Sequence, residues 1–191
     1  MALHEEQTDL PREERHAIEE AGILGKAIDK GGIVFAVGIV AAMLILIQEV
    51  ILRYVFNAPT IWAHETTIFL CALAFVYGGL YCTARDSHIR VVLIYDAVGP
   101  GTRRALDVVI SLVSAAASAI FAWASWEMVR RAAFRPDGSV RLETSGSAWD
   151  PPFPALLKLF LLAVMTAMTA QFLILAVGYA RRAARRRPEV R

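Results

Sequence analysis

The stretch GGIVFAVGIVAAMLILIQEVIL, residues 31–52, decides the fold class of this chain. Glu49 is the only charged residue in it. An α-helix of about 20 apolar residues, at roughly 1.5 Å rise per residue, is long enough to cross the hydrocarbon core of a bilayer. The stretch therefore predicts a membrane-spanning helix.

Three further apolar stretches follow at residues 61–84, 105–129 and 153–180, and the few charges within them lie near their ends. Hydrophobic residues make up 57% of the chain, against about 45–50% in an ordinary soluble domain. None of the stretches alternates like a strand of an outer-membrane barrel. We therefore expect an all-α integral membrane protein with four transmembrane helices in residues 31–180, flanked by a tail (1–30) and a basic tail (181–191).

The distribution of positive charge predicts the orientation of these spans. Fourteen lysines and arginines lie in the two tails and the second connecting loop, and five lie in the first and third loops. Cytoplasmic segments carry the excess of Lys and Arg, so both termini are expected in the cytoplasm of a bacterial inner membrane. We interpret the arginine-rich C-terminal tail as a topology signal that contacts anionic lipid, and not as a nucleic-acid site.

The N-terminal tail predicts a short amphipathic helix over residues 12–30. Its apolar residues share one face, and Gly31-Gly32 offers a bend into the membrane; a frayed tail is the alternative. Residues 1–30 contain eight acids and no apolar core of a signal peptide, so no cleavage is expected. The residues of the apolar face are Ala17, Ile18, Ala21, Leu24 and Ile28.

Small residues line the third span, where Ser114, Ser118 and Ala122 recur every four residues. Such a ladder lets two helices approach closely in lipid. Two interpretations stay open: ordinary packing within the four-helix unit, or docking of another membrane protein.

The sequence contains no motif for catalysis, phosphate binding or metal binding. Its histidines supply no paired haem ligands at membrane depth. We expect no enzyme activity and no catalytic, cofactor or metal site. Carriers place ionisable groups near the bilayer midplane, whereas here Gln171 is the main polar group of the central turns and is expected to join helices. Cys71 and Cys82 lie on one predicted helix, about 16 Å apart, and are interpreted as buried, unbridged thiols.

A more specific pattern surrounds the first hairpin. Residues 53–65 read RYVFNAPTIWAHE, Gly78-Gly79 follows, and residues 88–91 read HIRV. The chain thereby resembles the small permease subunit of tripartite ATP-independent periplasmic (TRAP) transporters, which typically has an Arg-aromatic-x-Phe-Asn turn, a Trp-x-x-Glu opening of the second helix and a His-Ile-Arg-Val stretch. His64 departs from the family, where an acidic residue often precedes the glutamate.

The resemblance implies a small, non-catalytic scaffold subunit of a sodium-coupled importer for organic acids or similar small solutes. Its partners would be a large elevator-type permease subunit, which would hold the sodium ions, and a periplasmic substrate-binding protein, with membrane lipids around the complex. Two alternative classes are a haem- or quinone-linked anchor subunit of a respiratory enzyme and a free-standing exporter.

Candidate structural or partner-contacting residues gather at both ends of the second span. Arg53 can pair with Glu49, four residues before it, or reach Glu65 across the hairpin. Trp62 is interpreted as an interfacial anchor. His88 and Arg90, at the predicted cytoplasmic end, are expected to meet lipid headgroups or the large subunit.

Overall fold

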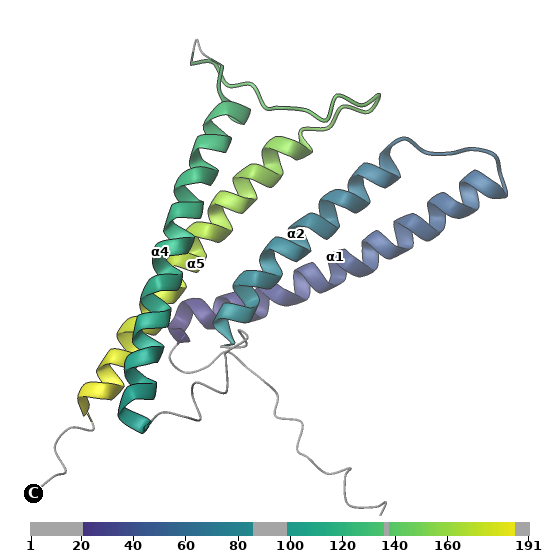
Figure 1. Cartoon of the computed structure of the whole chain (residues 1–191). Coiled ribbons are helices and arrows are strands. Elements are labelled where there is room, and N and C mark those ends of the chain that lie inside the picture. Colours follow the sequence, from purple (N-terminus) through teal and green to yellow (C-terminus); the bar gives the residue numbers. More distant parts are fainter. Residues whose placement is uncertain (1–20, 86–98, 136–137, 186–191) are drawn as a thin grey trace, which may run out of the picture.

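Four long helices make up most of the chain. The computed structural model describes residues 21–85, 99–135 and 138–185. The helices are α1 (Gly22–Tyr54), α2 (Trp62–Ala84), α4 (Pro100–Ala133) and α5 (Phe153–Arg185) (Figure 1). Each is long and apolar enough to cross a membrane. The predicted all-α fold with four membrane-spanning helices is confirmed.

Three helices, α1, α4 and α5, extend beyond the predicted spans because their polar ends stay helical, whereas α2 matches its predicted span to within one residue. Pro100 opens α4 at a first-turn position, where its missing N–H costs no hydrogen bond. At the far end of α4, Arg130 and Arg131 lie in the last turn and both bond Glu127. Hydropathy locates the part of a helix that lies in lipid, and not the turns that continue into the headgroup region.

The expected bend at Gly31-Gly32 is absent, since α1 runs through both glycines as one helix. A helix in lipid keeps every backbone group hydrogen-bonded, so a break there would be costly. Residues 22–30 are therefore the first turns of α1. Two residues of the predicted amphipathic face, Leu24 and Ile28, pack in a core cluster with Leu80 and Val164. Residues 1–20 lie outside the described part of the chain.

The main helix contacts run in the order α4, α5, α2, α1, an arrangement that we call the layer. α4 packs along α5, and α2 packs along α1. α5 joins the two hairpins through α2 and through the first half of α1, where Phe35 meets the ring of Phe160 at 5.6 Å. We call the end with residues 55–61 and 134–152 the loop end, and the opposite end the tail end. Figure 1 shows the helices fanning out toward the loop end.

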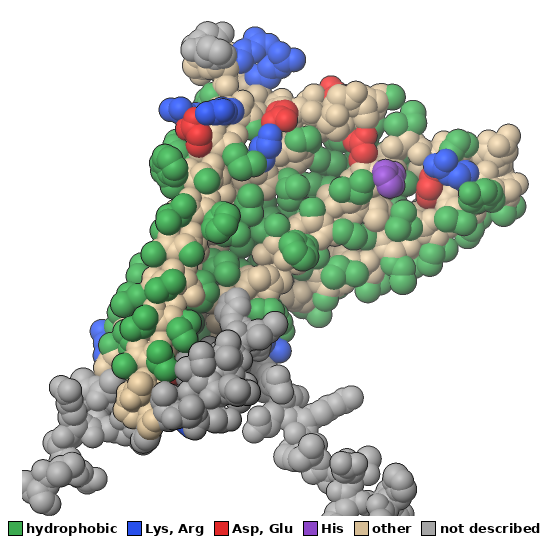
Figure 2. Space-filling model, viewed as in Figure 1, with side chains coloured by type: hydrophobic (Ala, Val, Ile, Leu, Met, Phe, Trp, Pro, Cys, Tyr) green, Lys and Arg blue, Asp and Glu red, His purple; other side chains and the backbone are tan. Residues whose placement is uncertain are grey.

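The core is small and lies along the helix contacts. One cluster joins α1, α2 and α5 around Ile28, Leu80 and Val164, and another joins α4 and α5 around Ala115 and Phe172. Large hydrophobic side chains cover much of the outer surface, while charges gather toward the ends of the helices (Figure 2). This is the distribution that a lipid solvent allows, because apolar surface is not penalised there.

Candidate functional site

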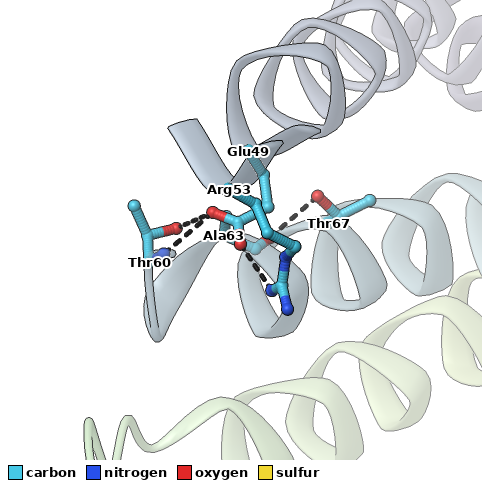
Figure 3. A network of polar contacts seen from close by, with 5 residues as sticks. All are labelled: Glu49, Arg53, Thr60, Ala63 and Thr67. Carbon is cyan, nitrogen blue, oxygen red and sulfur yellow. Dashed lines mark hydrogen bonds and ion pairs between the residues drawn. The ribbon is translucent and has the colours of Figure 1, made fainter. Parts of the chain in front are cut away.

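Glu49 is the centre of a polar cluster at the loop end of the first hairpin (Figure 3). Arg53 Nη2 donates to Glu49 Oε1 at 2.6 Å, and the backbone N–H of Thr60 donates to Glu49 Oε2 at 3.0 Å. The Thr60 hydroxyl donates to the same oxygen. Glu49 itself is 7% exposed. One carboxylate therefore joins the last turns of α1 to the segment that enters α2.

This contact lies one residue before the N-cap of α2. The residue before α2, Ile61, makes no side-chain capping bond. A buried backbone N–H needs an acceptor, and Glu49 of the neighbouring helix supplies one to Thr60. The reversal between the helices includes Asn57 at φ 49°, a left-handed conformation that asparagine tolerates better than most residues.

Arg53 does not bond Glu65, which was one of the two partners that the sequence allowed. It lies one turn after Glu49 on the same helix, which is the favourable spacing for an ion pair. Glu65 lies in the first turn of α2. Its Oε2 is buried and has no hydrogen-bond partner among the described residues. Glu49, and not Glu65, is therefore the acid that closes the hairpin.

Aromatic residues lie at the loop end of α2 and α5. Trp62 is the first residue of α2 and is 36% exposed. Trp149 meets the ring of Phe153 edge-on at 5.4 Å, and Phe153 stacks on Phe69 of α2 at 4.3 Å between centroids. The anchoring role of Trp62 stays a prediction. His88 and Arg90 lie outside the described residues.

The ladder of small residues lies beside the contact between α4 and α5, with Ser118 buried and Ser114 half-buried. Ser118 is buried, its hydroxyl donates to the carbonyl of Ser114 at 2.8 Å, and Thr169 Oγ1 of α5 donates to Ser118 Oγ at 3.1 Å. Ala122 is half-buried on the same helix. Of the two interpretations, the structure supports packing of α4 on α5. The buried positions of α4 recur at Ser111, Ala115, Ser118, Ser125, Val129 and Ala132.

Gln171 joins helices as expected, although its partner could not be foreseen. It is fully buried in α5, and its Nε2 donates to the carbonyl of Ala21, just before α1, at 3.2 Å. Its Oε1 is buried with no hydrogen-bond partner among the described residues. This bond places the start of α1 against α5 at the tail end.

The tail end of the first hairpin holds residues that sequence reasoning missed. The hydroxyl of Tyr77 donates to the carbonyl of Ile28 at 2.6 Å, and Arg85 Nε contacts Asp29 Oδ1 at 2.7 Å. A Cβ added at Gly32 would lie 2.6 Å from the ring of Tyr81. The sequence signal for this contact was the Gly31-Gly32 pair. Because neither glycine has a side chain, the rings of Tyr77 and Tyr81 can pack against α1 there.

The two cysteines are unbridged, as expected, but Cys71 is exposed and Cys82 is half-buried. The interpretation of Cys71 as a buried thiol is therefore wrong, because that side of α2 has no neighbour in this chain. No group of three or more metal-ligating side chains occurs in the part of the chain that the structure describes.

The family model for the DctQ component of tripartite ATP-independent periplasmic transporters matches residues 42–186. The chain belongs to this family. The match begins within α1 and takes in the Glu49 cluster, α2, α4 and α5. A search of curated proteins gave no significant match. This DctQ-family chain is thus a small, multi-pass inner-membrane component of a TRAP transporter, and the resemblance seen in its sequence is confirmed.

Proposed function

We propose that this DctQ-family chain is the non-catalytic scaffold subunit of a sodium-coupled importer for organic acids or similar small solutes. It pairs with a large elevator-type permease subunit, which binds sodium and solute, and with a periplasmic substrate-binding protein. Both tails lie in the cytoplasm. The observation that carries the proposal is the family match over residues 42–186.

The arrangement of the helices supports a scaffold role. Much of the outer surface of the helices is apolar and exposed, so a second membrane protein can cover part of it while lipid covers the rest. The polar side chains Glu49, Ser118 and Gln171 make contacts within the chain that hold helices together. Such a layer enlarges the fixed part of a transporter against which a moving domain slides.

Reconstitution into proteoliposomes tests this function. Vesicles with this chain alone should show no sodium-driven uptake of labelled organic acids. Vesicles with the chain and the large subunit, supplied with the binding protein, should take up the acid that the binding protein captures. The large subunit with the binding protein but without this chain is the matched control and should be inactive. Saturable, sodium-dependent uptake by this chain alone would refute the scaffold role.

A further inference from the structure

One side of α2 is uncovered although α2 lies within the layer. Its neighbours α1 and α5 pack against its flanks. The residues left exposed between His64 and Ala84 are separated by three or four positions, so they share one helix face. We call this face the α2 stripe, and it consists of His64, Ile68, Cys71, Phe75 and Gly79.

The α2 stripe has a ridge beside a hollow. Phe75 is 85% exposed, so nearly its whole ring projects from the surface. One turn away, a Cβ added at Gly79 would meet nothing within 4 Å, and the same holds for Gly78. Helix pairs in membranes associate where small residues let a large side chain of the facing helix approach the backbone. The surface shape of the α2 stripe, with Phe75 projecting beside the open backbone of Gly79, therefore suits contact with a facing helix.

Glu65 places a negative charge at the edge of the α2 stripe, which favours a partner with a positive charge. It follows His64 directly and precedes Ile68 by three residues, at the edge of the stripe. Its Oε2 is enclosed without a donor, while the side chain as a whole stays partly exposed.

Every other acid of the described residues has a partner. Asp107 makes an interaction within the chain, and the remaining pairs are Asp29–Arg85, Glu49–Arg53, Glu127–Arg130, Glu143–Lys158 and Asp150 with the N–H of Gly146. An unpaired carboxylate at the membrane boundary is costly. A cationic group from outside the chain would compensate it.

We propose that the α2 stripe docks a membrane helix of the large permease subunit, and that Glu65 accepts a hydrogen bond from a lysine or arginine of that helix. This inference rests on the proposed function and adds the contact surface to it. Phe75 packs against the facing helix, and the hollow at Gly78-Gly79 receives one of its side chains. The charge pair at the loop end sets the register of the two helices.

Site-specific photo-crosslinking in the assembled complex tests the surface. Phe75 is replaced by p-benzoylphenylalanine, and Phe121, a 64% exposed phenylalanine of α4, is replaced in a matched control. Irradiation should crosslink the position 75 variant to the large subunit and leave the position 121 variant free of it. Crosslinking of the large subunit at position 121 alone, or of a second copy of this chain at position 75, would overturn the proposal.

Glu65→Gln tests the charge pair, because glutamine keeps the shape and removes the charge. Energy transfer between fluorescent fusions of the two subunits, measured as lipid dilutes them in vesicles, reports their association. Loss of a charged hydrogen bond should weaken association roughly 10- to 100-fold. Glu127→Gln, whose acid pairs within its own helix, should leave it unchanged. Wild-type association of Glu65→Gln would overturn the pair, as expected if a lipid amine binds Glu65.

The wild-type complex separates the two levels of inference. If the wild-type chain fails to co-purify with the large subunit, the proposed function itself fails. If the wild-type complex assembles and transports while the position 75 variant gives no crosslink, only the docking surface is refuted.

Discussion

Glu49 lies at the end of the apolar part of α1, and three donors from two residues meet its carboxylate. A buried acceptor satisfied in this way is expensive to remove, because its donors lose their partner while the surrounding structure stays in place. Arg53 is half-exposed and keeps access to water and lipid headgroups. The Thr60 N–H, held near the start of α2, has no such freedom.

Glu49→Ala should lower the melting temperature of the purified chain in detergent, and by clearly more than Glu127→Ala does. Glu127 is the control because its carboxylate bonds Arg130 and Arg131 at the surface of α4, and such exposed pairs contribute little. Differential scanning fluorimetry on both variants makes the comparison. Equal shifts would show that Glu49 does not close the hairpin.

Gly31→Ala should destabilise the first hairpin by about 1–3 kcal/mol. A Cβ there would clash with the hydroxyl of Tyr77, whose ring is held by its bond to Ile28 and by stacking on Phe35 at 4.0 Å. Gly38→Ala is the matched control: it adds the same methyl group where nothing lies within 4 Å, and should change stability by no more than about 0.5 kcal/mol. Denaturant titration in mixed micelles measures both, and equal losses would contradict the packing role.

The sequence identified Arg53, Glu49 and Glu65 as a set but not how they pair. Spacing along one helix allowed Arg53 to bond Glu49, and proximity across the hairpin allowed it to bond Glu65. The choice depends on Thr60, whose N–H places a third donor beside Glu49. Such a contact depends on how the chain reverses between the helices, and no local pattern encodes that geometry. For the same reason, the sequence did not predict that Tyr77 and Tyr81 pack against Gly31 and Gly32.

Among the elements, α4 and α5 share the most extensive contact, with small side chains between them. Ser111, Ala115 and Ser118 lie buried on α4, and Thr169 of α5 bonds Ser118. Small residues bring the two backbones together, and the hydroxyls are satisfied by carbonyls of the preceding turn. This pair therefore tolerates little added volume.

Ser118→Leu should reduce the stability of the isolated chain by about 1–3 kcal/mol, since the larger side chain forces α4 away from α5. Ala117→Leu, at the exposed neighbouring position, should have almost no effect. Unfolding of the two purified variants gives the test. If the Ser118→Leu chain unfolds like wild type but fails to bind the large subunit, this face of α4 docks the large subunit instead.

Hydropathy predicted the existence and number of the helices, because length and apolar content alone decide whether a segment can cross the membrane. It could not predict that α1 begins at Gly22. The residues of the first turns are charged on one side and buried on the other, a pattern equally typical of a separate surface helix. The buried side settles the matter: Ile28 packs against Leu80 of α2 and Val164 of α5.

At the scale of the whole molecule, the order of the helices in the layer had no signal in the sequence. In water, the apolar side of a helix marks its contact with neighbours. In lipid, outward and inward surfaces are both apolar, so the face that packs differs mainly in side-chain size. The short connection at residues 55–61 predicted that α1 and α2 are adjacent, but the contact between α2 and α5 joins residues remote in sequence.

The orientation of the layer in the membrane stays a prediction from charge, and labelling of intact cells tests it. Single cysteines are placed at Thr144, exposed in the loop before α5, and at Ala184, in a background without Cys71 and Cys82. A membrane-impermeant maleimide should label Thr144→Cys and spare Ala184→Cys until the cells are opened. The reverse pattern would place both termini in the periplasm.

The division of the four helices into two hairpins has a further consequence for how the chain holds together. Each hairpin is built from helices that follow one another, and the hairpins meet mainly along α2 and α5, around the Phe69–Phe153 stack and the Leu80–Val164 contact. Two separately made pieces, residues 1–91 and 92–191, should therefore recombine in the membrane. With an affinity tag on the second piece, the first should be recovered with it. The pair should restore transport when the large subunit and binding protein are added, and recovery of the second piece alone would show that the backbone link between the pieces is needed. The chain would then behave as two helical hairpins that insert separately and associate along α2 and α5.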